Sequence, residues 1–179
     1  MKNDVKSVLF DERMIADRVG ELAQAIQNDY EGRELLLVGV LKGANVFLCD
    51  LMRRITRPIQ IDFIAASSYG SSTESSGVVK IDKDLDYSLE GRHVLIVEDI
   101  IDTGLTLNYL VNNFRSRKAA SVEVCSLLDK PERRRVDVPV KYIGFQIPDE
   151  FIVGYGIDYS ERYRNLPYVA TLKPEVYHK

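Results

Sequence analysis

Two short, continuous apolar runs constrain the fold of this chain more than any other feature. They are residues 35–40 (LLLVGV) and residues 94–97 (VLIV). Apolar runs of this length without polar alternation are typical of strands that are buried on both faces. Each run is followed by apolar residues at helical spacing: Phe47, Leu48, Leu51 and Ile55 after the first, and Leu107, Leu110, Val111 and Phe114 after the second. Strands that alternate with helices predict a mostly parallel sheet with helices on both faces.

The rest of the chain extends this α/β pattern. Asp11 can cap an amphipathic helix that ends near Gly32. Further strand candidates lie at 59–65, 78–81, 121–128, 142–145 and 169–172. The 179 residues are 45% hydrophobic, which is enough for a sizeable core, and they contain neither a repeat nor a linker. We therefore expect one domain that spans residues 1–179.

Charge and hydropathy restrict the partners of this protein. The net charge of −3 gives no general attraction to nucleic acid or to anionic lipid, so any phosphate binding has to be local. The first residues lack an apolar segment, and no stretch approaches the ~18 apolar residues of a membrane span. We expect a cytoplasmic protein. Cys49 and Cys125 lie in apolar periodic segments, so we expect buried free thiols.

The segment after the second apolar run carries the candidate chemistry. Glu98 and Asp99 end the run, and Asp102 opens a turn that contains Gly104 and leads directly into a helix. Ligands of parallel sheets bind at such carboxyl ends, and the amides of residues 103–106 at a positive helix end suit a phosphate. The acidic pair suits ribose hydroxyls or Mg²⁺. In the alternative interpretation Asp102 or Thr103 only caps the helix, which leaves the acidic pair unexplained.

Residues 94–106 (VLIVEDIIDTGLT) resemble the thirteen-residue phosphoribosyl pyrophosphate signature of type I phosphoribosyltransferases. The resemblance implies a twisted, mostly parallel sheet flanked by helices, with a small hood formed by segments near both termini. It assigns phosphoribosyl pyrophosphate to Glu98, Asp99, Thr103, Gly104, Leu105 and Thr106. Many relatives have lysine at the position of Leu105, so we expect backbone amides to hold the 5′-phosphate here.

Other segments resemble the hypoxanthine-guanine branch of that family. The segment 41–43 (LKG) matches its pyrophosphate loop, which implies roles for Lys42 and Gly43 and a cis peptide between Leu41 and Lys42. Arg164 matches an arginine that contacts pyrophosphate. Ser68 and Tyr69 match the catalytic lid, which shields an oxocarbenium-like transition state from water.

The purine side of the resemblance involves residues 128–131 and 147–159. It implies that Lys130 donates to the purine O6, that Phe151 stacks on the base, and that the Ile152 backbone reads the base edge. Asp102 is then the general base for N7. Asp158 also belongs to the purine-binding stretch and holds a second Mg²⁺ near the pyrophosphate, while Glu98 and Asp99 are the other ligands of this cofactor. The substrates implied are phosphoribosyl pyrophosphate with hypoxanthine or guanine, and the assembly is a homo-oligomer, dimer or tetramer.

Other interpretations remain open at this point. On the residues alone, Lys42 and Lys130 are also compatible with surface charge, and Phe151 with a core position. A regulator of the same fold that binds nucleic acid needs a basic face, and the only basic cluster, Arg133-Arg134-Arg135, is flanked by acidic residues. Among enzymes, the alternative is a xanthine-preferring or other purine transferase. We expect His93 and His178 to be bystanders.

Overall fold

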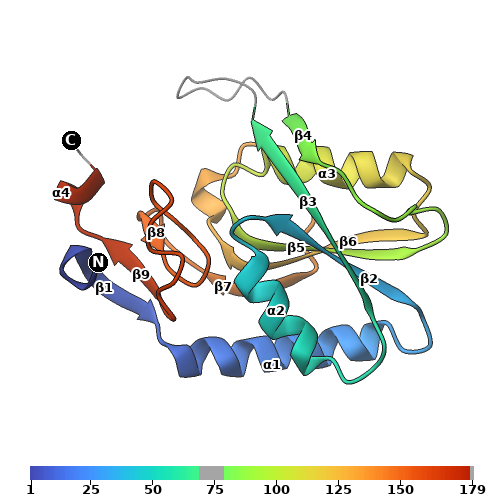
Figure 1. Cartoon of the computed structure of the whole chain (residues 1–179), viewed down its shortest axis with the longest axis horizontal. Coiled ribbons are helices and arrows are strands. Elements are labelled where there is room, and N and C mark those ends of the chain that lie inside the picture. Colours follow the sequence, from blue (N-terminus) through green and yellow to red (C-terminus); the bar gives the residue numbers. More distant parts are fainter. Residues whose placement is uncertain (69–78, 178–179) are drawn as a thin grey trace.

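A six-stranded sheet forms the centre of the protein in a computed structural model, which describes residues 1–68 and 79–177 (Figure 1). The strands are β2 (Leu35–Leu41), β3 (Gln60–Ser68), β4 (Val79–Lys83), β5 (His93–Ile101), β6 (Ser121–Asp129) and β7 (Tyr142–Gln146). Their order is β4-β3-β2-β5-β6-β7. All neighbours are parallel except β3 and β4, so the predicted, mostly parallel sheet is confirmed.

Helices cover both faces of this sheet (Figure 1). On one face lie α1 (Glu12–Asp29) and α2 (Asn45–Arg54), and on the other lies α3 (Leu105–Ser116). The α1 helix begins where the sequence predicts, since the Asp11 carboxylate accepts a hydrogen bond of 2.8 Å from the Met14 amide. The two apolar runs, now β2 and β5, lie side by side with buried residues on both faces, which explains why neither alternates.

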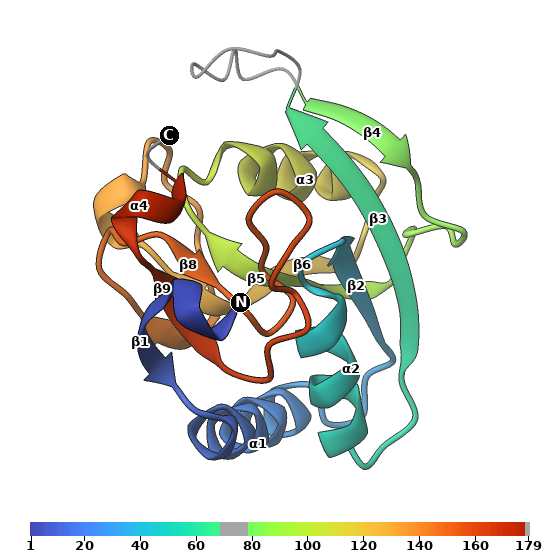
Figure 2. The same ribbon diagram turned by 60° about the vertical axis from the view of Figure 1, so that its left-hand side comes forward.

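A second, antiparallel sheet of three strands stands at one end of the larger one (Figure 2). Its order is β1 (Val5–Phe10), β9 (Val169–Leu172) and β8 (Ile152–Val153). Short helical turns η1 (Lys2–Asp4) and α4 (Pro174–Tyr177) lie near the two ends of the chain, and η2 (Pro131–Arg133) follows β6. The pairing of β1 with β9 joins the segments near both termini, and this part corresponds to the expected hood.

The two cysteines are free thiols, as expected, but only Cys125 is buried. The prediction that Cys49 is buried is wrong. Phe47, Leu48 and Leu51 form the inward face of α2, so Cys49 lies beside that face, half-buried, with its thiol 3.6 Å from Asn45 Oδ1. His93 Nδ1 lies 2.8 Å from the Ser121 hydroxyl at the start of two neighbouring strands, away from the carboxyl ends. In the described part of the chain, no helix is long and apolar enough to cross a membrane.

Candidate active site

Three loops meet where β2, β5 and β6 end, since these strands are parallel neighbours. The peptide between Leu41 and Lys42 is cis, as the resemblance implies. Gly43 follows it and packs directly on the acidic pair: a Cβ placed on Gly43 would lie 1.7 Å from Asp99 Oδ2. A Cβ on Gly156, from the loop after β8, would in turn lie 2.2 Å from the Gly43 carbonyl oxygen. These close approaches bring β2, β5 and the hood together around one site.

The loop between β5 and α3 surrounds a depression of about 210 Å³. It is lined by Glu98, Ile100, Ile101, Asp102, Thr103, Gly104, Thr106 and Leu107. Gly104 has φ of 82°, in the left-handed region that glycine adopts without strain, and α3 begins at the next residue, Leu105. Gly104 is the cap residue of the helix and has no side chain with which to bond the first amides. This arrangement leaves amides at a positive helix end, as a phosphate site requires.

Glu98 and Asp99 form a carboxylate pair beside this depression. Asp99 is buried, and its Oδ1 accepts a hydrogen bond of 2.8 Å from the Ile100 amide. Burial raises the pKa of Glu98 well above its ordinary value, and the neighbouring Asp99 carboxyl raises it further. Burial also raises the pKa of Asp99. Such a pair is stabilised by a cation such as Mg²⁺ or by hydroxyl donors such as those of a ribose.

Asp102 is not the cap of α3. Its Oδ1 accepts a hydrogen bond of 2.9 Å from Arg133 Nε, across 31 positions of sequence. The residue that serves the turn locally is Thr103, whose hydroxyl accepts a hydrogen bond of 3.4 Å from the Leu105 amide. The capping interpretation therefore does not hold for Asp102, and its carboxylate stays at the rim of the depression, about half exposed.

Lys130 lies beyond the carboxyl end of β6 and is only 8% exposed. Its Nζ donates a hydrogen bond of 2.6 Å to the Glu150 carbonyl, directly before Phe151 and Ile152. It is therefore not an ordinary surface lysine. The Phe151 ring stacks on Tyr177 at 4.8 Å and meets Tyr159 edge-on at 5.1 Å, so it belongs to an aromatic cluster of the hood. Ile152 is buried in β8.

The cationic side of the site is held together by Glu161. Its Oε2 lies 2.9 Å from Lys42 Nζ and its Oε1 lies 3.1 Å from Arg164 Nη2. Asp158 Oδ1 also pairs with Arg164 Nη2, at 2.9 Å. Lys42, followed by Arg164, lowers the pKa of Glu161, which keeps this carboxyl ionised. The structure thus brings Lys42, Asp158 and Arg164 together through a residue that the sequence analysis did not select.

Of the expected site residues, Ser68 and Tyr69 are not fully described by the structure. β3 ends at Ser68, the side chain of Ser68 is outside the description, and Tyr69 lies outside the described residues, as does His178. Within the described ranges, no group of three or more His, Cys, Asp or Glu side chains is arranged to hold a metal ion.

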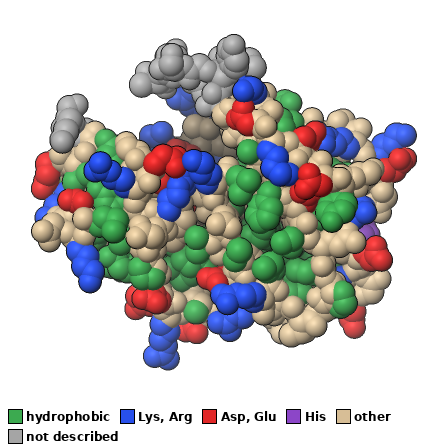
Figure 3. All heavy atoms as spheres, viewed as in Figure 1, with side chains coloured by type: hydrophobic (Ala, Val, Ile, Leu, Met, Phe, Trp, Pro, Cys, Tyr) green, Lys and Arg blue, Asp and Glu red, His purple; other side chains and the backbone are tan. Residues whose placement is uncertain are grey.

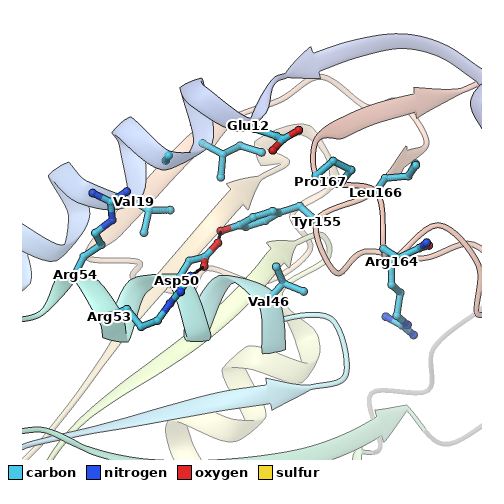
Figure 4. A pocket seen from close by; sticks show the side chains of 13 residues that line it. Glu12, Val19, Val46, Asp50, Arg53, Arg54, Tyr155, Arg164, Leu166 and Pro167 are labelled. Atoms are coloured by element: carbon cyan, nitrogen blue, oxygen red, sulfur yellow. Dashed lines mark hydrogen bonds and ion pairs between the residues drawn. The ribbon is translucent and has the colours of Figure 1, made fainter.

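A larger cavity, of about 670 Å³, lies elsewhere, between α1, α2 and the loop before β9 (Figure 4). Of the expected site residues only Arg164 lines it, and its guanidinium points away from Tyr155 and Asp50, which form a hydrogen bond of 2.6 Å there. None of Glu98, Asp99, Asp102 and Asp158 lines this cavity.

Residues 7–160 match the family described as "Phosphoribosyl transferase domain". The chain belongs to this phosphoribosyltransferase family. It is 54% identical to the hypoxanthine-guanine phosphoribosyltransferase of Bacillus subtilis, covering 99% of this chain and 98% of the relative. A crystal structure of a hypoxanthine phosphoribosyltransferase from Staphylococcus aureus has a TM-score of 0.96 at 52% identity, covering 99% of this chain and 96% of that one.

Some phosphoribosyltransferase relatives are much longer than this chain. A Listeria monocytogenes relative named "Bifunctional protein TilS/HprT" is 53% identical over 99% of this chain, which spans only 27% of that relative's length. The likeness thus covers nearly all of this chain but about a quarter of the bifunctional protein.

No pattern in the sequence of this phosphoribosyltransferase singles out Arg133, Asp149 or Glu161. Arg133 belongs to the basic cluster 133–135, yet it pairs with Asp102, and Arg134 pairs with Asp129. On the face drawn in Figure 3, basic and acidic side chains are interspersed. Opposite charges near a strand end are the only local signal for such pairs, and they do not specify the partner.

Proposed function

We propose that this phosphoribosyltransferase transfers the 5-phosphoribosyl group from phosphoribosyl pyrophosphate to N9 of hypoxanthine or guanine, giving IMP or GMP and pyrophosphate. The observation that carries the proposal is a main-chain contact between the loop after β6 and the end of β5: the Lys130 amide donates to the Ile101 carbonyl at 3.0 Å. This contact joins Lys130, a buried donor suited to the purine O6, to the segment that carries Glu98, Asp99 and Asp102. The names of the full-length relatives support the same substrates.

The proposed roles follow the three parts of the substrates. The amides and hydroxyls of residues 103–106 bind the 5′-phosphate, and Glu98 and Asp99 bind the ribose. Lys42, Gly43 and Arg164 bind pyrophosphate, after the carboxylate of Glu161 has been displaced. For the purine, Lys130 donates to O6, Phe151 stacks on the ring, and Ile152 offers its backbone to the base edge.

In the proposed reaction the purine N9 attacks the ribose C1′ as the bond to pyrophosphate breaks. Asp102 accepts the N7 proton, so that the nucleotide leaves with a neutral base. In the reverse direction the same group returns the proton. Ser68 and Tyr69 belong to the lid that excludes water while positive charge develops on the ribose. Glu98 and Asp99 place negative charge next to that cation.

Mg²⁺ is the proposed cofactor. The fit rests on the Glu98–Asp99 pair, because among the described residues neither carboxylate forms an ion pair, burial raises both pKa values, and Mg²⁺ prefers such oxygen ligands. Asp158 offers a further carboxylate near Arg164. When bound, the ion neutralises charge on the pyrophosphate group. Removal of divalent ions should abolish turnover, and turnover that survives exhaustive chelation would refute this part.

We further propose one domain over residues 1–179, a cytoplasmic location, a homo-oligomeric assembly and no role for nucleic acid or membrane. The central test is steady-state kinetics with phosphoribosyl pyrophosphate, Mg²⁺ and each of guanine, hypoxanthine, xanthine, adenine and uracil. We expect turnover with guanine and hypoxanthine and little with adenine or uracil. Turnover with xanthine well above the other two would favour the xanthine alternative, and none with any purine would refute the proposal.

A further inference from the structure

Arg133 joins two acidic side chains that come from distant parts of the sequence. Its Nε donates to Asp102 Oδ1 at 2.9 Å, and its Nη1 lies 3.7 Å from Asp149 Oδ2. Asp102 follows β5, whereas Asp149 precedes β8 of the hood. The Arg133 guanidinium therefore connects the loop between β5 and α3 to the hood, as the forked geometry of arginine allows.

Asp149 continues this chain of charges to Lys130. The other carboxylate oxygen of Asp149, Oδ1, lies 3.7 Å from Lys130 Nζ. The four side chains thus run Asp102, Arg133, Asp149, Lys130 with alternating charge. Each inner member faces an opposite charge on both sides, which fixes the order of the chain.

The backbone around η2 makes this arrangement rigid. The Arg133 amide donates to the Lys130 carbonyl at 3.2 Å, and the Lys130 amide donates to the Ile101 carbonyl at 3.0 Å. Two residues further, the Arg135 amide donates to the Thr103 carbonyl at 2.9 Å. The segment that carries Lys130 and Arg133 is therefore bound by main-chain hydrogen bonds to both sides of Asp102.

Asp102 and Lys130, the two end members of this row of charges, would contact neighbouring atoms of the same ligand. A 6-oxopurine that carries its proton on N7 presents an N7–H donor next to the O6 acceptor on one edge. In the proposed function Asp102 serves N7 and Lys130 serves O6, so the distance between carboxylate and ammonium has to match that edge. A rigid linker between them meets this requirement, and a hydrogen bond to Oδ1 alone leaves Asp102 Oδ2 to accept the N7 proton.

We infer that Arg133 and Asp149 are positioning residues that set Asp102 and Lys130 at the spacing of N7 and O6 of a 6-oxopurine. This inference rests on the proposed function. The Arg133 and Asp149 side chains are 47% and 44% exposed, and exposed ion pairs contribute only about 0–1 kcal/mol to stability. Their removal should therefore change the rate of the chemical step and leave the stability of the fold nearly unchanged.

The test compares Arg133→Gln and Asp149→Asn with the control Arg135→Gln, which removes the same charge two positions away. Single-turnover rates are measured with saturating hypoxanthine and phosphoribosyl pyrophosphate, alongside urea unfolding. We expect both test variants to lose about 10- to 100-fold in rate, the usual effect of a misplaced catalytic group. The KM for phosphoribosyl pyrophosphate and the unfolding midpoint should stay near wild type, and Arg135→Gln should retain the wild-type rate.

Two further variants test whether Arg133 and Asp149 act through one connected row of side chains or independently of each other. The double variant Arg133→Gln with Asp149→Asn should be no slower than the worse single variant, because either change breaks the same chain. Arg133→Lys keeps the charge but not the fork, so its rate should lie between Arg133→Gln and wild type. Multiplied losses in the double variant, or wild-type rates in Arg133→Gln, would overturn the inference. Absence of turnover in the wild-type protein would instead refute the proposed function.

Discussion

Gly43→Ala is the substitution whose effect follows most directly from the geometry of the site. The added Cβ would lie 1.7 Å from Asp99 Oδ2 and 2.6 Å from Asp99 Cγ. This separation has to grow by more than about 1 Å before the atoms reach a tolerable contact. Asp99 cannot simply turn away, because it is buried and its other oxygen is held by the Ile100 amide at 2.8 Å.

Either the loop or the carboxylate must therefore move. Overpacking of this kind costs roughly 1–3 kcal/mol of stability. The displaced Asp99 should also weaken binding of phosphoribosyl pyrophosphate by about tenfold or more, since a lost charged hydrogen bond is worth about 1.5–3 kcal/mol. Urea unfolding and titration calorimetry with phosphoribosyl pyrophosphate and Mg²⁺ measure the two effects separately.

Gly20→Ala is the matched control. Gly20 lies inside α1 and a Cβ there would meet no atom within 4 Å. Replacing a helical glycine with alanine should stabilise the protein by about 0.5–1 kcal/mol and leave ligand binding unchanged. If Gly43→Ala binds phosphoribosyl pyrophosphate as tightly as wild type and unfolds at the same urea concentration, the close packing of the loop on Asp99 is not needed for the site.

Three further substitutions test single residues. Asp102→Asn keeps an oxygen for Arg133 but abolishes the base, so the single-turnover rate should fall by about 10²–10⁴; a nearly unchanged rate would move the base to Glu98 or Asp99. Lys130→Ser should weaken binding of guanine and hypoxanthine by roughly 1.5–3 kcal/mol, measured as base affinity, and equal affinity would place the O6 contact elsewhere. Glu98→Gln should raise the Tm at neutral pH, by about 2–4 °C for each kcal/mol by which the folded protein disfavours the ionised carboxyl. Because folding raises the pKa of Glu98, this gain should vanish below the ordinary pKa of 4.5, where the carboxyl is protonated in both states. A gain that persists at acidic pH would show that the raised pKa is not its source.

The central strands were predictable from the sequence because their burial on both faces leaves a local signature. Strand partners were less predictable. The candidate at 169–172 exists as β9, yet it pairs with β1, where Val5 faces Leu172, and not with the large sheet. The strand at 79–83 runs antiparallel at the sheet edge. Pairing across so many residues depends on the assembled fold, and no local pattern encodes it.

The site divides in the same way. The Glu98–Asp99 pair, Lys42 and Lys130 follow strand ends, so the α/β pattern alone directs attention to them. The contacts of Arg133 with Asp102 and of Glu161 with Lys42 span 31 and 119 positions. Ion pairs at such separations leave no periodicity in the sequence, which is why these partners become visible only in three dimensions.

The bridge formed by Glu161 has a consequence for selectivity among cellular anions. Lys42 and Arg164 are two cations on facing loops, and inorganic phosphate and many metabolites would compete for them. A tethered carboxylate competes with these anions at a high effective concentration, since it belongs to the same molecule. An anion with only one point of attachment gains little by replacing it. In the proposed function, a ligand that is anchored at the same time by its phosphate, its sugar and its diphosphate would displace Glu161, so the internal carboxylate would favour the complete substrate over its fragments.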